Sequence, residues 1–546
     1  MRLQHVVISP AVILAAVTLA AGSGQAQTTW YVDDDACPGP GSGTPADPFC
    51  KIQDGINAAV RGDMVLVLPG TYLENIALVD KGITLRSDGD GNPATHDISP
   101  EATIIDGQTL GSVVTFASTS ELEDSLLEGF TITNGKAELG GGICCNSNTA
   151  PVISHNVITS NTSAYGGSWL LLGGGIYCSG SSVHITGNTI ADNNCSGIGG
   201  GIAVTAGSSV RIAGNTVARN EAVAGECAGI YCESSACEIV GNLIVDNFAF
   251  NKPLDCYGGG ISCVDSQALI TNNIIAANVA AGSEGPGYGG GLSCLSSIVT
   301  LENNTIFMNS SDYMGGGIFT ERSEITVSSS ILWANEAVRG DQISGNPEVS
   351  YCDVQDGWPG IGNIDSDPLF VDSDGPDDDS GTWEDNDLRL AAGSPCIDAG
   401  APGTDRCTDK DYFGNPRVLD ALGTHEPRID MGAHEFDHVH LQVTGNATPG
   451  AALTFTTSGT PAFHVWLFVG TQPGALCLGH YGGLFFDFSS PWFQFFWGRI
   501  PPSGSFDVTV AVPATMPVPT QLVFQELGRY AGNWGTTSNP VEIVIE

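Results

Sequence analysis

The chain has 546 residues, of which 18 are Lys or Arg and 60 are Asp or Glu, so its formal net charge at pH 7 is −42. That charge excludes the basic surface that nucleic-acid binding needs and opposes electrostatic attachment to anionic membranes. Only 14% of the residues are charged and 42% are hydrophobic, which excludes a charge-expanded disordered chain. The 72 glycines follow no period of three, which excludes a collagen-like chain.

The first 26 residues are typical of a secretory signal peptide. Arg2 and His5 precede an apolar run over residues 6–21, and Gly24 and Ala26 are the small residues before a cleavage site after Ala26. The alternative is a membrane anchor, but the run is shorter than the ~20 residues that a spanning helix needs. We therefore expect a secreted or cell-surface protein with no transmembrane segment after cleavage.

A repeated frame of the form I-x-x-N-x-I-x-x-N fills the middle of the chain. Its first positions are Asn156, Asn188, Asn215, Asn242, Asn273, Asn304 and Ser330, and its second positions are Asn161, Asn193, Asn220, Asn247, Asn278, Asn309 and Asn335. We interpret each copy as one coil of a parallel β-helix of about eight coils, with inward aliphatics stacked from coil to coil. Asn tolerates the left-handed backbone of a sharp bend, and its amide can bond the coils on both sides. The asparagines are therefore expected to form two structural columns and not to bind ligands.

Cysteines share this register. Five of them lie two residues after the aliphatic that opens a coil and should point inward with it, namely Cys145, Cys178, Cys232, Cys263 and Cys294. They are either small buried hydrophobes or partners in disulfides between coils, such as Cys263–Cys294, since the coil spacing suits a disulfide. Cys37–Cys50 and Cys396–Cys407 are stronger disulfide candidates, because they lie in Pro- and Gly-rich sequence outside the coils.

The two ends of the repeat region differ in pattern from the coils. An amphipathic stretch at 52–60 precedes a first strand at 64–68 and is expected to close the open end of the solenoid. Beyond residue 437, short alternating runs separated by Gly, Pro and Ser predict an all-β C-terminal β-sandwich of about seven or eight strands. These runs are 439–443, 453–457, 464–469, 493–497, 506–510, 522–525 and 541–545. The expected organisation is a signal peptide (1–26), a β-helix with its cap (27–340), an acidic region (341–436) and the sandwich (437–546).

Several segments resemble a known group of exported proteins. The sequence YVDDDACPGP at 31–40, the GGGI coils and SILWANEA, which ends at residue 337, look like right-handed parallel β-helix proteins of the pectin-lyase-like superfamily, with PbH1-type repeats. GNIDSDPLFVD at 362–372, SPCIDAG at 394–400, GNPR at 414–417 and DMGAHEF at 430–436 resemble the choice-of-anchor Q region that follows such helices. The resemblance covers roughly residues 30–436 and implies the fold. It implies little about activity, since most members look like surface or secreted proteins of unassigned function.

The resemblance also implies what an enzyme would need. Enzymes that resemble pectate lyases hold Ca²⁺ with clustered Asp and use Arg or Lys as the base, and those that resemble polygalacturonases gather several Asp on one coil face. Residues 140–340 contain neither set. Asp192, Arg219 and Asp246 share one offset in three coils, which predicts surface ion pairs, since two carboxylates are too few for a Ca²⁺ site. We expect a non-catalytic scaffold with no catalytic residues. The alternative is a calcium-dependent polysaccharide lyase or a glycoside hydrolase.

Loops of variable length follow the second Asn of each coil, and such inserts often form the binding side of a solenoid. Four of their aromatic residues are the candidates for substrate binding: Tyr257, Tyr288, Trp169 and Phe250. Tyr257 and Tyr288 precede GGG at equal offsets and should stack in neighbouring coils. Because flat aromatic faces suit sugar rings, the expected partner is a polysaccharide or cell-envelope glycan. The alternative is that these rings cover the apolar surface of their own loops.

An acidic segment at 365–387 contains ten carboxylates and no basic residue. Within it, Asp372, Asp374, Asp377 and Asp379 resemble a D-x-D-G calcium loop, since Ca²⁺ takes several oxygens from a flexible loop with glycine at the bend. The segment lacks the Glu at position 12 that an EF-hand requires. Structural Ca²⁺ and a solvated acidic loop are the two interpretations.

Overall fold

The structure, a computed structural model, describes residues 27–436 outside gaps at 38, 90–97, 119–124, 147, 165–170, 224, 252–254, 284, 376–382, 384–385, 403–409, 415–416 and 418–427, and beyond 438 it describes strand backbones. The predicted signal peptide lies outside the described residues, so export stays a prediction. Among the described residues, no helix is long and apolar enough to cross a membrane.

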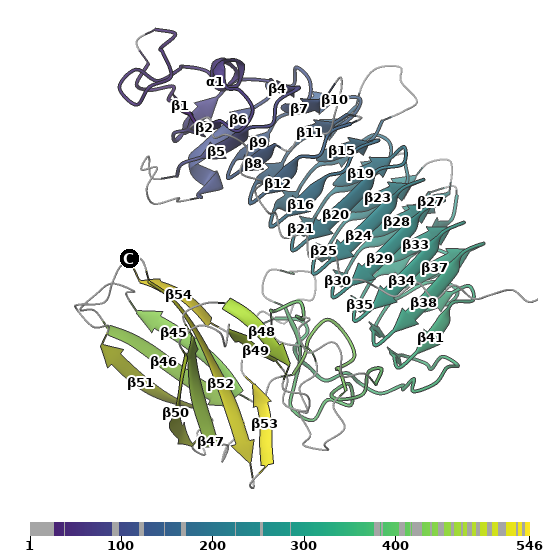
Figure 1. The fold of residues 1–546 in the computed structure, drawn as a ribbon. Coiled ribbons are helices and arrows are strands. Elements are labelled where there is room, and N and C mark those ends of the chain that lie inside the picture. The colour runs from purple at the N-terminus through teal and green to yellow at the C-terminus, as the bar shows by residue number, and fades with distance from the viewer. Residues whose placement is uncertain are drawn as a thin grey trace, which may run out of the picture.

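The chain forms a parallel β-helix in which four stacks of short strands run along the solenoid, as predicted (Figure 1). The 12-stranded sheet contains β1 (Thr29–Val32), β2 (Met64–Val67), β5 (Thr84–Ser87), β8 (Leu126–Glu128), β12 (Val152–Ser154), β16 (His184–Thr186), β20 (Ser209–Ala213), β24 (Ala236–Val240), β29 (Gln267–Thr271), β34 (Ile298–Glu302), β38 (Glu324–Ser328) and β41 (Glu348–Ser350). The 11-stranded sheet contains β3 (Gly70–Tyr72), β6 (Thr103–Asp106), β9 (Thr131–Thr133), β13 (Val157–Thr159), β17 (Thr189–Ala191), β21 (Thr216–Ala218), β25 (Leu243–Val245), β30 (Ile274–Ala276), β35 (Thr305–Phe307), β39 (Ile331–Trp333) and β42 (Asp353–Val354).

Two further stacks complete the solenoid, and the shorter one is present only in its middle coils. The 10-stranded sheet contains β4 (Ile76–Val79), β7 (Val114–Ala117), β11 (Ile143–Cys145), β15 (Ile176–Ser179), β19 (Ile202–Thr205), β23 (Ile230–Glu233), β28 (Ile261–Val264), β33 (Leu292–Leu295), β37 (Ile318–Glu321) and β40 (Ile343–Ser344). The seven-stranded sheet contains β10 (Lys136–Ala137), β14 (Thr162–Ser163), β18 (Asn194–Cys195), β22 (Glu221–Val223), β26 (Phe248–Asn251), β31 (Val279–Gly282) and β36 (Ser310–Ser311). A two-stranded pair, β27 (Cys256–Tyr257) and β32 (Gly287–Tyr288), and the short 3-10 helix η1 (Pro100–Ala102) lie outside these four stacks.

The strands are in register, so equivalent side chains lie directly above one another. In the 10-stranded sheet, Ile230 pairs with Ile261 and Ile261 with Leu292. Because strand side chains alternate between faces, one set points into the solenoid, where these aliphatics are completely buried in a single core. Each coil therefore buries its apolar side against the next coil.

Both predicted columns of asparagines are present. Asn215 shows the pattern: its backbone N–H and its side-chain amide both donate to Oδ1 of Asn242 in the next coil, at 2.9 and 3.0 Å. The same side-chain amide donates to the carbonyl of Ile185 in the preceding coil, at 2.9 Å. The asparagines of both columns are buried, and their amides satisfy the backbone of the bends, which would otherwise be costly to bury.

One detail of the column prediction is wrong. The left-handed backbone belongs to the residue before each Asn, not to the Asn itself. Ser160, Asp192 and Arg219, with φ between 51° and 57°, precede the second column. His155 and Gly187 precede the first column in the same conformation. The preceding residue turns the chain, and the Asn that follows fixes the turn with its side chain.

The cysteines in register point inward and are buried, as predicted. The cross-coil disulfide Cys263–Cys294 does not form, and both residues are free thiols. In register on parallel strands, their Cβ atoms point the same way, which is a poor arrangement for an S–S bond. Cys232 instead bonds Cys237 on β24.

The two loop disulfides have different outcomes. Cys37–Cys50 is confirmed. The predicted Cys396–Cys407 bond is wrong, because Cys396 is a free buried thiol that donates to Asp353 Oδ2 at 3.2 Å. Cys396 is thereby turned toward the solenoid, and Cys407 lies outside the described residues.

The N-terminal end is closed as the amphipathic pattern predicts. Helix α1 (Ile52–Ala58) buries Ile52, Gly55 and Ile56 against the first coils. The first strand is β1, however, not the strand at 64–68, because Asp63 accepts hydrogen bonds from Thr28 N and the Trp30 indole at 3.0 and 3.1 Å and holds that segment beside β2.

Described residues between 383 and 436 pack on the outer face of the 11-stranded sheet. Trp383, Leu388 and Ala433 share one buried cluster with Ala276 and Phe307 of the coils. Gly432, at φ 91°, lies so close that a Cβ there would approach Ile331 Cδ1 to 2.7 Å. Within this segment, β44 (Asp387–Leu390) forms an antiparallel pair with β43 (Phe370–Asp372), which precedes the segment in the chain. The outer face of that sheet is therefore covered in the later coils.

Beyond residue 438, strands occur at all seven predicted positions, and they pair in antiparallel fashion. The strands are β45 (Val439–Gly445), β46 (Ala452–Gly459), β47 (His464–Gly470), β48 (Pro473–Cys477), β49 (Gly483–Phe486), β50 (Trp492–Arg499), β51 (Ser505–Ala511), β52 (Thr520–Tyr530), β53 (Asn533–Thr537) and β54 (Val541–Ile545). That their sheets face one another as a sandwich stays a prediction, since the described part consists of backbone.

Candidate functional site

Aromatic side chains gather where the seven-stranded sheet turns toward the 10-stranded sheet. On β26, Phe248 and Phe250 both point outward, and their rings stack with centroids 6.1 Å apart. The Phe248 side chain is 40% exposed, and Val223 on β22, which pairs with Phe250, is 41% exposed. Solvent thus meets an apolar surface on neighbouring strands.

The predicted tyrosine stack adjoins this surface. Tyr257 on β27 pairs in register with Tyr288 on β32, and the two rings are nearly parallel, with centroids 4.9 Å apart and planes 10° apart. The β27–β32 pair contacts β26 and β31. We call Phe248, Phe250, Tyr257, Tyr288 and Tyr313 the aromatic corner.

Tyr288 lies at the centre of the aromatic corner. The Tyr313 ring lies nearly perpendicular to the Tyr288 ring, with centroids 5.6 Å apart, and the centroid of the buried Phe319 ring is 4.7 Å from that of Tyr288. The Tyr257–Tyr288 stack covers one face of each ring, so the pair cannot offer two open faces to a ligand. Tyr288 therefore mainly supports the corner, and Phe248 and Tyr257 are left to meet a ligand.

Carboxylates hold the corner in place. Asp312 accepts the backbone N–H of Gly282 and of Gly287 and so fixes the loop that carries Tyr288. The Tyr257 hydroxyl donates to Asp255 Oδ2 at 3.3 Å. Arg339 lies 5.6 Å above the ring centroid of Tyr313, in a cation–π arrangement. The corner thus combines apolar rings with hydrogen-bonding groups, and carboxylates outnumber guanidinium groups.

The hydroxyl groups of Tyr257 and Tyr288 stay protonated at neutral pH. Burial, followed by the nearby Asp255 carboxylate, raises the pKa of both Tyr257 and Tyr288. Each hydroxyl can therefore donate a hydrogen bond as well as accept one.

One carboxyl group beside the corner is perturbed. Burial, and then the charges of Glu233 and Asp255, raises the pKa of Glu226. A carboxyl group that keeps its proton nearer to neutral pH is suited to general acid catalysis.

The other predicted site residues have mixed outcomes. Trp169 lies outside the described residues. Of the calcium candidates, Asp372 and Asp374 are described, whereas Asp377 and Asp379 are not. Within the described part of the chain, no three His, Cys, Asp or Glu side chains are grouped so that they could hold a metal ion. Calcium therefore stays a prediction.

The predicted ion pair of Asp192 and Arg219, which directly follow β17 and β21 of the 11-stranded sheet, lies at the surface. Arg219 Nε and Nη2 donate to the two carboxylate oxygens of Asp192 at 3.0 and 3.2 Å. Both side chains are nearly half exposed, and such a pair contributes little to stability. This geometry agrees with the surface interpretation.

Sequence reasoning missed two members of the corner's surroundings. Phe319 lies on β37, and Arg339 lies after the last repeat of the asparagine frame, so neither residue belongs to an insert loop. The usable signal for Phe319 was strand alternation, because it follows the inward Ile318 and must point outward.

Comparison with protein-family models agrees with a β-helix architecture. A family model described as "Right handed beta helix region" matches residues 103–285. Among solved structures, the chain is similar to the pectate lyase Pel9A, at 14% identity and a TM-score of 0.41, over 76% of this chain and 97% of that one. It is also similar to the enzymatically active domain of tailspike protein 2 of bacteriophage CBA120, at 12% identity and a TM-score of 0.18, over 91% and 73% of the two chains. A search of curated proteins gave no significant match.

Proposed function

We propose that this chain is an exported, non-catalytic β-helix scaffold that binds a polysaccharide or cell-envelope glycan through the aromatic corner. The observation that carries the proposal is the gathering of outward aromatic rings and fixed hydrogen-bonding groups on adjacent strands. Sugar rings have apolar faces and hydroxyl edges, which match such a surface. Strands of a packed solenoid hold these groups rigidly, and rigidity reduces the entropy lost on binding.

The charge of the protein narrows the class of glycan. The net charge is −42, and Asp255 and Asp312 lie within the corner itself. A polyuronate would be repelled at low salt. The proposed ligand is therefore a neutral polysaccharide whose hydroxyls donate to these carboxylates.

Binding assays with purified protein test this proposal. We expect Phe248→Ala and Tyr257→Ala each to weaken binding to neutral polysaccharides about 2–10-fold, because each removes one stacking ring. Leu269→Ala is the matched control, since Leu269 is 41% exposed on the outer face of the 12-stranded sheet. Equal affinities of all three variants and the wild type would refute the aromatic corner as the binding surface.

A second function is favoured by the raised pKa of Glu226 beside Asp255, which suits a glycoside hydrolase. Protein incubated with neutral polysaccharides would then release reducing ends, and Glu226→Gln would abolish that release. A calcium-dependent lyase would instead produce unsaturated uronides from pectin or alginate, seen as a rise in ultraviolet absorbance. Absence of both products supports the non-catalytic scaffold.

Attachment to the cell envelope belongs to the same proposal. The segments that resemble a choice-of-anchor Q region, together with the C-terminal strands, follow the solenoid in the chain. Cell fractionation of the producing organism, with and without residues 437–546, tests whether this part holds the protein at the surface.

A further inference from the structure

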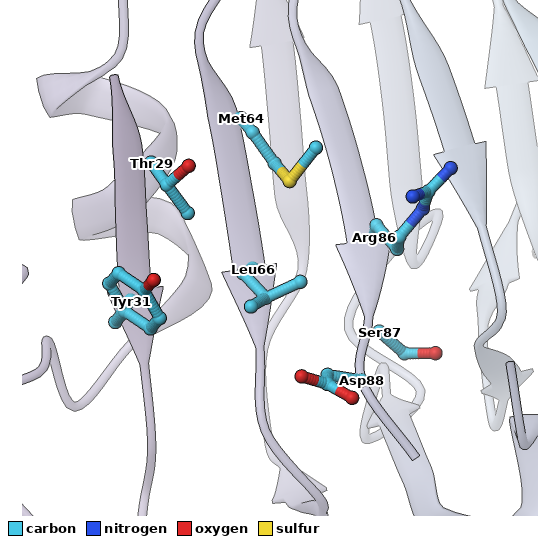
Figure 2. A pocket seen from close by; sticks show the side chains of 7 residues that line it. All are labelled: Thr29, Tyr31, Met64, Leu66, Arg86, Ser87 and Asp88. Carbon is cyan, nitrogen blue, oxygen red and sulfur yellow. The ribbon is translucent and has the colours of Figure 1, made fainter. Parts of the chain in front are cut away.

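A small pocket lies at the N-terminal end of the solenoid, on the outer face of the first three strands of the 12-stranded sheet (Figure 2). Its volume is about 190 Å³. The described residues that line it are Thr29, Tyr31, Met64, Leu66, Arg86, Ser87 and Asp88.

The pocket follows from the register of the strands. Tyr31 pairs with Leu66 and Leu66 with Arg86, so these three residues form one row across β1, β2 and β5. The Leu66 side chain is shorter than those of Tyr31 and Arg86 on either side, so the row forms a depression over Leu66. Tyr31 and Arg86 are two strand spacings apart, about 10 Å. The result is a slot with an apolar floor.

The floor and walls of the slot are apolar, and its end is polar. Leu66 is only 3% exposed although it is on an outward-facing position. Met64 lies beside it and the Tyr31 ring forms one wall (Figure 2). The carboxyl group of Asp88 lies at the same end as Leu66 and Tyr31 (Figure 2), and it is almost completely buried. The slot thus offers an aromatic wall, an aliphatic floor and a hydrogen-bond acceptor.

The positive charge of Arg86 is compensated by a carboxylate outside the pocket. Its Nε and Nη2 donate to Glu128 Oε2 on β8 at 2.7 and 2.6 Å. Glu128 is fixed further by Ser154, whose hydroxyl donates to it at 3.0 Å. The guanidinium is therefore neutralised and held toward the following strand, and its aliphatic stem remains as the second wall.

We propose that this pocket binds a single neutral sugar ring, which makes it a second glycan subsite independent of the aromatic corner. Its volume is below the ~300–1,000 Å³ of pockets for drug-sized ligands, so it suits one ring and excludes an oligosaccharide. The apolar face of a sugar ring would lie on Tyr31, Met64 and Leu66. Its hydroxyls would donate to Asp88, and a uronate would be repelled by the net charge of −42 of the protein.

The Met64 methyl group provides a direct probe. The protein is labelled at its methionine methyl groups, the Met64 resonance is assigned with Met64→Leu, and methyl glycosides of neutral hexoses are titrated in. We expect a saturable shift of the Met64 resonance, at least a threefold loss of affinity in Tyr31→Ala, and no shift with a methyl glucuronide. No saturable shift at about 50 mM ligand, well above the millimolar range of weak binding, would overturn the proposal.

Filling the pocket gives a second test. Leu66→Phe replaces the side chain at the bottom of the pocket with a larger aromatic one and should abolish the ligand-induced shift of the Met64 resonance. Leu269→Phe, at an outward position of the same sheet, should retain the shift. Phe248→Ala should also retain the shift, so failure of the corner and failure of the pocket are distinguishable. Melting temperatures of all variants confirm that they fold, and equal shifts in Leu66→Phe and Leu269→Phe would contradict the proposal.

Discussion

Arg417 Nη1 donates to Glu435 Oε2 at 3.1 Å, and both side chains are buried. The other terminal nitrogen of Arg417 donates to Asn272 Oδ1, at 2.6 Å, and to the carbonyl of Gly432, at 3.0 Å. Asn272 belongs to a coil of the solenoid, so one guanidinium joins the described segment 428–436 to the β-helix. The residues of GNPR and DMGAHEF that meet here thus have a structural role that their sequence did not reveal.

Removing this guanidinium should release the segment. Arg417→Met leaves the Glu435 carboxylate buried without its cation, which typically costs about 3–5 kcal/mol. We expect protease cleavage within residues 383–436 well before cleavage of the coils. Arg389→Met is the control, because Arg389 is half exposed and bonds Asp387 only two residues away. Equal cleavage of both variants would show that the ion pair does not hold the segment.

The asparagine columns should be sensitive to single substitutions. Asn247→Ala removes the acceptor for Asn220 N and the donor to Val217 O and Asn278 Oδ1. Because the bend backbone is then buried without partners, the free energy of unfolding should fall by about 1–3 kcal/mol. Thermal or denaturant unfolding measures this loss.

Asn194→Ala is the control for that experiment. Asn194 is half-buried on β18, and its amide donates to Glu221 at 3.2 Å near the surface. Its replacement should change the free energy of unfolding by less than about 0.5 kcal/mol. A loss as large as that of Asn247→Ala would contradict the prediction that the buried asparagine columns contribute more to the free energy of unfolding than a surface asparagine does.

A buried carboxyl group should make stability depend on pH. Burial raises the pKa of Asp353 to about 6, above its ordinary value, so the folded state binds the proton more tightly than the unfolded state. Its contribution is therefore most favourable at acidic pH and is lost as the pH rises through about 6. Asp353→Asn should stabilise the protein at pH 8 by about 1–3 kcal/mol, and the difference should shrink toward pH 5.

Other groups titrate in the same range, so the comparison must be between the variant and the wild type. Burial, and then Arg417, lowers the pKa of His434 to about 3. The unfolded state therefore takes up a proton at His434 first, and acidification below about pH 6.5 reduces stability through this residue. A gap between Asp353→Asn and wild type that stays constant from pH 5 to pH 8 would contradict the assignment to Asp353.

Calcium removal tests the acidic segment at 365–387. If Asp372, Asp374, Asp377 and Asp379 hold a structural Ca²⁺, EDTA should lower the melting temperature and added Ca²⁺ should restore it, because a ligand that binds only the folded state stabilises it. Asp374→Asn should remove most of that dependence. A melting temperature unchanged by EDTA would leave a solvated acidic loop.

The coils were predictable because each repeats the same physical problem. Every coil must bury its aliphatic side chains and satisfy the backbone of one bend at each Asn column. Asparagines equivalent to Asn242 and Asn247 therefore occur once per repeat in the sequence and once per coil in the structure. The residue that takes the left-handed backbone was missed because its identity varies: His155, Gly187 and Ser329 occupy equivalent places. Once the following Asn fixes the bend, several residue types suffice there.

Contacts between distant segments were not predictable in the same way. Arg417 meets Asn272 across 145 residues, and Cys396 meets Asp353 across 43 residues. Neither pair is formed by residues that recur at a regular spacing, so the sequence contains no pattern from which the contact could be predicted. The tyrosine stack was predicted from equal offsets, but the covering of one face of each ring follows from ring orientation, which spacing does not specify.

The register of the asparagine columns has a consequence for the length of the molecule. Asn188, Asn215 and Asn242 are equally spaced in the sequence, and each bonds the next. Excision of residues 215–241 would bring Asn188 beside Asn242, with equivalent partners restored on both sides. The solenoid can thus be shortened or extended by whole coils, and the number of coils determines the distance between its N-terminal helix and its last strands.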